Sequence, residues 1–335
     1  MTGPRVSVLM PVRNEERFLP AALASLERQT FADWELVAVD DGSIDATPRI
    51  LSDAAARDRR VRAICNPGQG LVAALNHGLS LCRAPLVARM DGDDVSHPSR
   101  LERQTALLAA EPGIGLVACG FRHFPRSGVG IGMAAYERWQ NGLLDHTEIM
   151  RDLFVESPFV HPSVMFRREH LEAVGGYHDM GWAEDYDLWL RLAAAGVRFA
   201  RLPESLFFWR ERPERATRTM DEYSAAAFRA CKVHHLCAGF LAGVAEVTLA
   251  GAGLEGRAWR TALERGGVRV GRWVDVDPRK VGRTLHGAPV VAPGEVRAGE
   301  GKMLLTVGTR GAREGVRSWA REAGFREGID FICVT

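Results

Sequence analysis

The sequence predicts an α/β protein with a mostly parallel central sheet, followed by a second, smaller α/β domain. Three observations support this prediction. Short apolar runs alternate with segments of helical spacing over roughly the first hundred residues. Three of these runs end in polar residues, after Met10, Val39 and Met90. A strand, a glycine-rich turn and a helix then begin a new alternation at Val247.

The composition is that of an ordinary globular protein. The chain has 335 residues, of which 46% are hydrophobic and 25% charged, and this length suggests two domains. The net charge of +1 gives no general electrostatic reason to expect nucleic acid as a partner. The six cysteines contain no CxxC pair, which favours free thiols in a reducing cytosol. Without a secretion signal or an apolar run of roughly 18 residues, we expect a cytoplasmic protein. A peripheral contact with the inner face of the membrane and a homo-oligomer stay open.

Four short, mainly apolar segments in the first ninety residues are predicted to be strands, and the first of them has the pattern of a buried strand. They are Val6 to Pro11, Trp34 to Val39, Val61 to Ile64 and Leu86 to Met90. The segments between them have helical spacing or helix-start residues. They give helices over Phe18 to Gln29, from an Asp45 N-cap through Ala56, and from Gly68-Gln69-Gly70 through Leu81. Since ligands bind at the carboxyl ends of strands in such sheets, we expect the site at that edge.

The later part of the first domain is predicted from shorter patterns. The expected strands are Leu116 to Gly120 and Ser163 to Phe166, the expected helices are Glu184 to Ala195 and Asp221 to His235, and Phe207 to Arg218 is an Arg-rich loop. Gly239 and Gly243 interrupt the pattern. We therefore expect one domain over residues 1–238 and a second over residues 245–335.

The second domain repeats the strand–helix alternation. Its expected strands are Val247 to Ala250, Arg269 to Val276, Met303 to Val307 and Phe331 to Val334, with helices to Arg265 and over Ala312 to Ala323. Gly251, Gly253 and Gly256 follow the first of these strands, and Asp275 ends the next. This is the context of a dinucleotide-binding turn, whose glycines let a pyrophosphate approach a helix N-terminus. Because the domain is shorter than a full dinucleotide fold, a purely architectural or assembly role is the alternative.

Three carboxylates, Asp91, Asp93 and Asp94, follow the fourth strand within four residues. Such carboxylates repel one another unless a cation offsets their charge. A hard divalent ion takes oxygen ligands, and Mg²⁺ often binds through one or two carboxylates plus a diphosphate. The motif therefore favours a divalent-metal site, with a solvated acidic turn that caps the next helix as the alternative.

Five motifs occur along the first two-thirds of the chain. They are Pro11-Val12-Arg13-Asn14-Glu15, Val39-Asp40-Asp41-Gly42-Ser43, Asn76-His77-Gly78, Arg89-Met90-Asp91-Gly92-Asp93-Asp94 and Trp182-Ala183-Glu184-Asp185-Tyr186-Asp187-Leu188. In this order they resemble family 2 glycosyltransferases of the GT-A fold. One departure is Arg13, where the family often has an aromatic residue. The second domain resembles small Rossmann-like domains with an Asp-x-Asp-Pro-x-Lys-x-Gly motif, here Asp275 to Gly282.

The resemblance implies a metal-dependent hexosyltransferase of bacterial polysaccharide or glycoconjugate synthesis. Its donor would be a UDP- or GDP-type nucleotide sugar, its acceptor a carbohydrate or lipid-linked hydroxyl, and its metal Mg²⁺ or Mn²⁺. The residues implied for the pocket of the base and ribose are Pro11, Arg13, Asn14, Glu15 and Asp41. Asp93 would bind the metal, and Asp91 would contact the metal, the ribose or an ordered water. Asn76 and Arg89 are candidates for the sugar or ribose, with strand–helix packing as the alternative.

Glu184 and Asp185 form a second carboxylate centre. An inverting transfer needs one base to take the acceptor proton as the acceptor oxygen attacks the anomeric carbon. The resemblance places this base in the pair, and we favour Asp185; acids that favour the helix dipole are the alternative. Trp182 would form an apolar wall against a sugar face. His161 would lie near the acceptor, or act as a structural residue or metal ligand. Trp209 to Arg215 resembles a loop that closes over the diphosphate.

Two other classes of function are weighed against this one. A nucleotidyltransferase would need a Gly/Arg/Lys-rich loop after the first strand, and Arg13-Asn14-Glu15-Glu16 is not such a loop. A nucleotide-sensing regulatory protein with a decayed transferase domain would have lost its acids, and all of them are present. The sequence therefore favours the glycosyltransferase.

Overall fold

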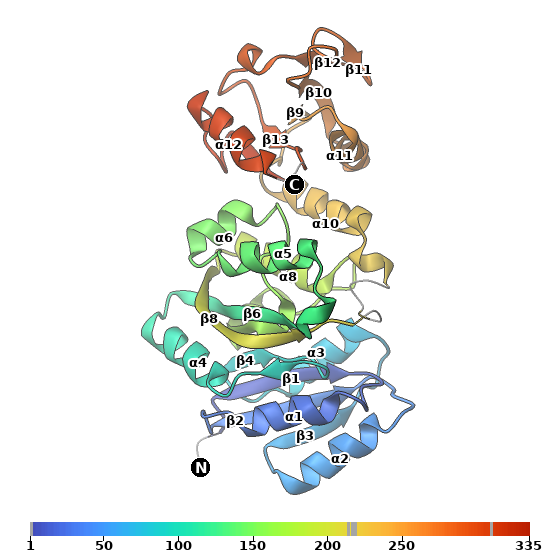
Figure 1. The fold of residues 1–335 in the computed structure, drawn as a ribbon, viewed down its shortest axis with the longest axis vertical. Helices are drawn as coiled ribbons and strands as arrows, with labels where there is room; N and C mark the ends of the chain where they lie inside the picture. Colours follow the sequence, from blue (N-terminus) through green and yellow to red (C-terminus); the bar gives the residue numbers. More distant parts are fainter. Residues whose placement is uncertain (1–2, 213–214, 216–219, 309–310) are drawn as a thin grey trace. The chain divides into compact units, whose positions relative to one another are not determined.

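The structure, a computed structural model, describes residues 3–212, 215, 220–308 and 311–335. These residues form two compact units, each with its own sheet (Figure 1). The first comprises the described residues of Met1–Ile149, Pro158–Met180 and Glu184–Thr219, and the second those of Met150–Ser157, Gly181–Ala183 and Met220–Thr335. Both units are α/β, as the sequence predicts. Within the described residues, none of the helices has the length and hydrophobicity that crossing a bilayer requires.

The first unit is built on an eight-stranded sheet in the order β3-β2-β1-β4-β7-β6-β8-β5. The strands are β1 (Val6–Val12), β2 (Trp34–Asp40), β3 (Val61–Cys65), β4 (Leu86–Arg89), β5 (Val95–Ser96), β6 (Ile114–Phe124), β7 (Val164–Arg167) and β8 (Arg198–Arg210). Strands β1 to β4 run parallel, β7 is antiparallel to β4 and β6, and β8 is parallel to β6. The predicted parallel strands are confirmed: β1, β2 and β4 are buried along their whole length, as mainly apolar segments predict, whereas burial alternates along the edge strand β3.

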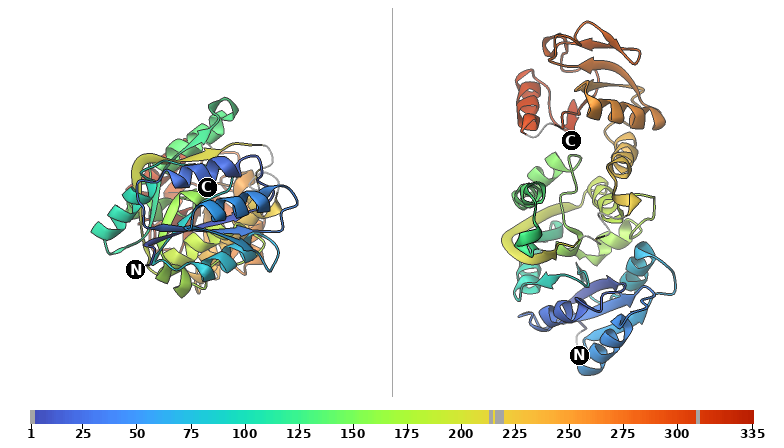
Figure 2. Two further views of the ribbon diagram at one scale, coloured as in Figure 1. Left: turned by 90° about the horizontal axis from the view of Figure 1, so that it is seen from below. Right: turned by 45° about the vertical axis from the view of Figure 1, so that its right-hand side comes forward.

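Helices cover both faces of the four parallel strands (Figures 1 and 2). The helices of this unit are α1 (Leu19–Glu27), α2 (Thr47–Arg57), α3 (Leu71–Leu81), α4 (Arg100–Ala110), α5 (Ile131–Asn141), α7 (Arg168–Ala173) and α8 (Glu184–Ala194), while α6 (His146–Asp152) ends in the second unit. Leu23 of α1 and Leu51 of α2 share a core with Val8 of β1. Helix α3 covers the other face, where a Cβ on Gly78 would lie 2.3 Å from Leu9 Cδ1. Gly78 is therefore needed for this close packing.

Strand β8 differs from its prediction. The sequence predicts an Arg-rich loop that begins at Phe207, and this start is wrong. Phe207–Arg210 is instead the end of β8 and pairs with Phe121–Phe124 of β6. Phe207 is fully buried, whereas Arg210 is half-buried at the carboxyl end. Burial does not alternate along this end of the strand, since Leu206 and Phe207 are both buried and the next three residues are half-buried, so the sequence lacks the period-two signal of a strand.

The second unit contains a six-stranded sheet in the order β11-β12-β10-β9-β13-β14. The strands are β9 (Glu246–Ala250), β10 (Arg269–Val274), β11 (Thr284–Leu285), β12 (Ala288–Val291), β13 (Met303–Leu305) and β14 (Phe331–Cys333), and the helices are α10 (Ala225–Ala238), α11 (Leu254–Arg265) and α12 (Ala312–Glu322). All strands are parallel except β11, which forms a hairpin with β12. The unit is therefore Rossmann-like in its strand–helix alternation.

Helix α10 belongs to the second unit, so the compact units divide the chain earlier than the predicted boundary between residues 238 and 245. Val233 and Leu236 of α10 share a core with Trp259 of α11. The buried Lys232 ammonium donates to the carbonyl oxygens of Val155 (2.7 Å) and Val334 (3.2 Å). These contacts stabilise α10 on the second sheet, whereas the sequence pattern showed only an interruption after this helix.

A buried carboxylate near the amino ends of β1 and β2 gives a stability prediction. Glu35 accepts hydrogen bonds from Ser7 Oγ (2.7 Å) and from the backbone and side chain of Arg83, and Arg62 lies 3.2 Å away. Burial raises the pKa of Glu35, but the hydrogen bonds from Arg83 and Ser7 outweigh it, so the pKa is lowered overall. Glu35→Gln should therefore lower the free energy of unfolding by about 1–3 kcal/mol at pH 7, measured by urea denaturation.

The pH dependence of this effect has a definite sign. A lowered folded-state pKa stabilises the fold above the unfolded-state pKa of about 4.3, and the stabilisation disappears as the pH falls through the folded-state value. The difference between wild type and Glu35→Gln should thus shrink in acid. Glu27→Gln, an exposed substitution in α1, should leave stability unchanged. A pH-independent difference for Glu35→Gln would contradict the electrostatic explanation.

Candidate active site

The three polar loops expected at one sheet edge follow neighbouring parallel strands. Val12 of β1 lies in register with Asp40 of β2, and Leu9 of β1 with Arg89 of β4. The chain segments that follow Val12, Asp40 and Arg89 therefore leave the sheet at the same carboxyl edge. This is where the topology of an α/β sheet places ligands.

The acidic cluster after β4 is compact. One carboxylate oxygen from each of Asp91, Asp93 and Asp94 lies within 4.8 Å of the others. The turn needs a glycine at position 92, because a Cβ there would lie 2.6 Å from Val12 Cγ1. Asp94 is fully buried; its Oδ1 accepts the backbone N–H of Arg210 at 2.6 Å, and its Oδ2 has no hydrogen-bond partner among the described residues.

Electrostatics show that the cluster is deficient in positive charge. Burial and the charges of Asp93 and Asp91 raise the pKa of Asp94 well above its ordinary value. Burial and the charge of Asp91 likewise raise the pKa of Asp93, although Arg212 opposes this. Clustered carboxylates with an unpartnered buried oxygen are suited to a hard divalent cation. The residues present therefore fit the metal that the family resemblance implies.

Two arginines that follow the acidic cluster by more than a hundred residues contact it. Arg212 Nε lies 3.0 Å from Asp93 Oδ2, and Arg212 Nη2 pairs with Glu15. Arg210 Nε donates to the Asp93 carbonyl oxygen at 2.6 Å and stacks on Phe18, with 4.3 Å between guanidinium and ring centroid. A cavity of about 530 Å³ opens beside them. It is lined by Asn14, Glu15, Glu16, Arg17, Phe18, Asp45, Pro125, Arg210, Glu211 and Arg212. Both arginines lie in the segment that the sequence assigned to the diphosphate, and their contacts with the cluster were not foreseen.

The loop after β1 is held by the loop after β2. Asn14 has a left-handed backbone (φ 54°), accepts the N–H of Ile44 on Oδ1 and donates its own N–H to Ser43 Oγ. Burial and the charge of Asp93 raise the pKa of Glu15 to about 7, against the effect of Arg212. Pro11 is buried within β1.

Asp41 lies at the corresponding edge of β2. Its Oδ1 accepts hydrogen bonds from Asn66 Nδ2 (2.7 Å) and Gly70 N (3.0 Å). Arg13, the departure from the family pattern, is 3.8 Å from Asp41 Oδ2 and largely exposed. Of the residues expected around the base, Arg13, Asn14, Glu15 and Asp41 thus lie in adjacent loops at one edge.

Arg89 and Asn76 have protein partners. The buried Arg89 pairs with Asp91 Oδ1 at 2.7 Å, and within the part of the chain that the structure describes its Nε has no hydrogen-bond partner. Asn76 donates to the Tyr177 carbonyl oxygen (2.8 Å) and accepts the Tyr177 N–H (2.9 Å). Asn76 therefore fixes the backbone of Tyr177, a residue that the sequence analysis did not identify.

Glu184 and Asp185 begin α8. Burial and the charge of Glu184 raise the pKa of Asp185 well above its ordinary value, and the charge of Asp91 adds to this. The two carboxylate centres are thus close enough to interact. Glu184 is buried, with Oε1 3.4 Å from His161 Nδ1, and His161 Nε2 is 2.9 Å from the Tyr177 hydroxyl.

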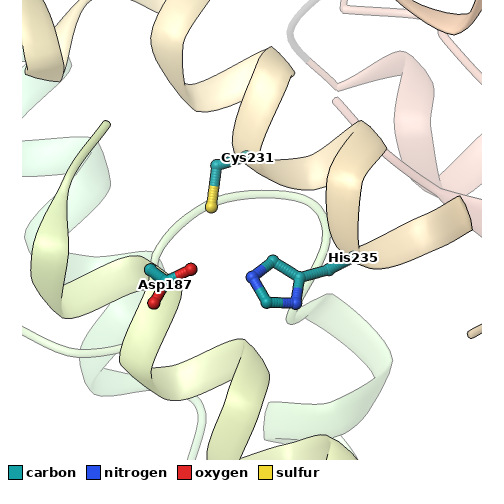
Figure 3. A group of neighbouring side chains, drawn as sticks. All are labelled: Asp187, Cys231 and His235. Carbon is teal, nitrogen blue, oxygen red and sulfur yellow. The ribbon is translucent and has the colours of Figure 1, made fainter. Parts of the chain in front are cut away.

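Trp182 belongs to the second unit, and its ring centroid lies 5.4 Å from that of His234. Helix α10 also carries Cys231 and His235, which project from the same side one turn apart (Figure 3). Figure 3 draws Asp187 as well, which is on α8 of the first unit. The proposed contact of Trp182 with a sugar stays a prediction.

The glycine-rich turn of the second unit has the expected backbone. Gly251 has a φ of +112°, and a Cβ on Gly256 would lie 1.9 Å from the Gly251 carbonyl oxygen, so glycine is required at both positions. Gly253 is the N-cap of α11. Asp275 Oδ2 accepts the N–H of Ala252 (2.9 Å) and pairs with Lys280 Nζ (2.8 Å). Asp275 therefore stabilises the turn itself.

Comparison with known proteins supports the resemblance of the first domain to family 2 glycosyltransferases. The model of the family described as "Glycosyl transferase family 2" matches residues 7–175. EpsE of Bacillus subtilis (strain 168), named a glycosyltransferase, is 33% identical over 240 residues, which are 69% of this chain and 83% of EpsE. An Escherichia coli UDP-Gal:alpha-D-GlcNAc-diphosphoundecaprenol beta-1,3-galactosyltransferase is 28% identical over 218 residues, or 64% of this chain and 77% of the relative.

Solved structures share the fold. S. aureus TarS 1-349 in complex with UDP-GlcNAc matches with a TM-score of 0.57 and 17% identity, covering 78% of this chain and 80% of TarS 1-349. The mannosyltransferase PcManGT from Pyrobaculum calidifontis, in complex with GDP-Man and Mn²⁺, matches with a TM-score of 0.50 and 23% identity, covering 70% of this chain and 63% of that one. The first unit therefore has the predicted GT-A fold. Together, the family model, the relatives and the fold show that the chain belongs to glycosyltransferase family 2 and is a glycosyltransferase.

Proposed function

We propose that the first unit transfers a hexosyl group from a UDP- or GDP-sugar to an acceptor hydroxyl with inversion. One observation carries this proposal. The cluster Asp91, Asp93 and Asp94, at the carboxyl edge of the sheet, suits a cation, and the charge of Asp91 acts on Asp185, a separate carboxylate whose pKa burial and Glu184 raise. Carboxylates whose different environments give them different pKa values, and so different roles, are typical of active sites.

Asp185 is the proposed general base. It takes the proton of the acceptor hydroxyl while the acceptor oxygen bonds to the anomeric carbon. The bond from this carbon to the diphosphate oxygen breaks, and the nucleoside diphosphate leaves with the electron pair. A raised pKa makes Asp185 a stronger base than an ordinary carboxylate.

The leaving diphosphate needs positive charge. Asp93 and Asp91 are the proposed ligands of Mg²⁺ or Mn²⁺, with the buried Asp94 beside them. When bound, the ion offsets the charge that develops on the diphosphate. Arg212 and Arg210 supply further positive charge, since guanidinium groups bind phosphate oxygens through two N–H donors. The structure of PcManGT, which contains GDP-Man and Mn²⁺, supports a divalent metal in general.

The nucleotide and sugar have proposed contacts at the same edge. Pro11, Arg13, Asn14, Glu15 and Asp41 are the proposed wall for the base and ribose. Arg89 acts through its ion pair with Asp91, and Asn76 acts through Tyr177. Among relatives, the name of the Escherichia coli galactosyltransferase indicates a lipid-linked diphosphate acceptor. We propose a carbohydrate or lipid-linked acceptor in bacterial polysaccharide synthesis, reached from the cytoplasmic face of the membrane.

Donor turnover tests this function directly. The full chain is incubated with a panel of UDP- and GDP-sugars, lipid-linked and free sugar acceptors, and Mg²⁺ or Mn²⁺, and release of the nucleoside diphosphate is measured. We expect metal-dependent release with one donor. A nucleotide-sensing protein would bind nucleotide without turnover, and a nucleotidyltransferase would release pyrophosphate from a nucleoside triphosphate. No release across the panel, together with no metal-dependent binding of UDP or GDP, rejects the proposal.

A second nucleotide site in the second unit is a separate proposal. The required glycines Gly251 and Gly256 and the start of α11 form the type of turn that accepts a pyrophosphate. A Cβ on Gly253 would meet no atom of the described residues within 4 Å, so Gly253→Asp should fold and place a carboxylate where the phosphate would bind. We expect this change to weaken nucleotide binding at least about tenfold.

Calorimetry with NAD, UDP and ATP measures this effect. The titrations use the full chain carrying Asp93→Asn, so that the first site contributes little binding. Gly294→Asp, at another open position of the second unit, is the control and should bind normally. If none of these nucleotides binds, the glycine-rich turn has an architectural role alone.

A further inference from the structure

His161, Tyr177 and Glu184 form a buried row of polar side chains beside Asp185. The three residues are 7%, 2% and 6% exposed. Tyr177 Oη lies 2.9 Å from His161 Nε2, and His161 Nδ1 lies 3.4 Å from Glu184 Oε1. The row therefore connects the hydroxyl of Tyr177 to the carboxylate that neighbours the proposed base.

The backbone of Tyr177 is held in place from another element. Asn76 of α3 makes two hydrogen bonds to the Tyr177 backbone. The preceding residue, Gly176, has a φ of +72°, and a Cβ there would lie 2.6 Å from Asn76 Oδ1. Only glycine suits this approach, so the position of the Tyr177 ring is strongly constrained. Trp189 of α8 packs edge-on against the His161 ring at 5.7 Å and restricts it further.

The hydrogen-bond partners in this row determine which nitrogen of the His161 ring carries the hydrogen. An ionised Glu184 carboxylate can only accept, so His161 Nδ1 must carry the hydrogen. Nε2 is then the acceptor for the Tyr177 hydroxyl. Burial and the charge of Arg89 lower the pKa of His161, against the effect of Glu184, so the ring stays neutral near pH 7. A neutral donor stabilises the charged form of Glu184 without cancelling its charge.

We propose that His161 is a positioning residue, which holds Glu184 as the charged partner that does not react and thereby selects Asp185 as the base. This inference rests on the proposed function of the first unit. It replaces a direct contact of His161 with the acceptor. The charged and titratable groups that act on Asp185 are Glu184, Arg89 and Asp91, and those that act on His161 are Arg89, Glu184 and Asp91, with Tyr177 in contact.

The inference makes a specific prediction for the acid limb of the pH–rate profile. In wild type, the charge of Glu184 keeps Asp185 basic, so activity falls when Asp185 gains a proton. Without the His161 donor, Glu184 takes the proton more readily, and Asp185 faces less negative charge. Asp185 then stays ionised to lower pH but is a weaker base. His161→Phe should therefore lower the plateau of kcat about tenfold and move the acid limb about one pH unit downward.

The experiment measures kcat against pH from release of the nucleoside diphosphate, and donor Kd by calorimetry. The donor Kd of His161→Phe should change by less than about twofold, because His161 is not a donor contact in this proposal. Tyr177→Phe, which removes one hydroxyl, should move the acid limb in the same direction by a smaller amount. His123→Phe is the matched control, because His123 is also buried and pairs with a glutamate, Glu137 (2.9 Å). This control should lower thermal stability without moving the acid limb.

The outcomes separate this inference from the proposed function. A lower plateau with an unmoved acid limb in both His161→Phe and Tyr177→Phe means that the row is merely structural, and it overturns the inference. An upward move of the limb, or a weakened donor affinity, overturns it as well. If His161→Phe does not fold, Tyr177→Phe alone decides. Retained turnover in Asp185→Asn would instead reject the assignment of the base itself.

Discussion

Asp185→Asn should lower kcat by about 10²- to 10⁴-fold while leaving donor binding nearly unchanged. The substitution keeps the shape of the side chain and removes the atom that accepts the proton. The half-buried Asp185 begins α8 and accepts the N–H of Tyr186 at 2.6 Å, a contact that an asparagine oxygen can also make. The fold and the donor pocket should therefore stay intact, and the loss should fall on the chemical step.

The measurement is kcat from release of the nucleoside diphosphate, with donor Kd from calorimetry. The raised pKa of Asp185 means that its charged form costs stability at neutral pH, so Asp185→Asn should melt at or above the wild-type temperature. The exposed Asp179→Asn is the control and should be fully active. If Asp185→Asn retains turnover, the base is a different group, and Glu184→Gln is the next variant to measure.

Asp93→Asn should abolish metal-dependent donor binding. Asp93 is the carboxylate of the cluster that lies 3.0 Å from the Arg212 guanidinium, so it already attracts positive charge in the structure. Removing one of the proposed ligands should weaken Mn²⁺ affinity by about 100-fold or more, and kcat should fall at least as far. Chelation of the metal by EDTA should have the same effect on the wild type.

Titration of Mn²⁺ into the protein with UDP or GDP present measures this affinity without turnover. Asp53→Asn, an exposed substitution in α2, controls for the change of net charge and should bind normally. Equal Mn²⁺ affinity in wild type and Asp93→Asn would show that the metal, if required, is held elsewhere. If Asp93→Asn binds Mn²⁺ more weakly but keeps the wild-type kcat at saturating Mn²⁺, then Asp93 contributes to metal binding and not to the chemical step.

The sequence predicted most of the parallel half of the first sheet. Mainly apolar segments such as Trp34–Asp40 are buried on both faces, and this preference is visible in the sequence without any tertiary information. The same runs end in polar residues, and strand polarity then places those residues at one edge. Helix α4 and strand β8 were not predicted, because their buried faces include charged residues, Arg100 and Arg201, where apolar residues are expected. Their guanidinium groups donate to backbone carbonyl oxygens inside the fold.

Residue types and local order therefore established the chemistry, namely clustered carboxylates after β4 and a second acidic pair at the start of α8. The partners of these residues came from the fold. Asn76 meets Tyr177 across 101 residues, and Arg210 meets Asp94 across 116. No periodic pattern encodes such pairs, because each depends on how distant elements pack against one sheet. The physical reason is that burial acts along each segment and leaves a local signature, whereas hydrogen bonds between segments exist only after the segments have packed.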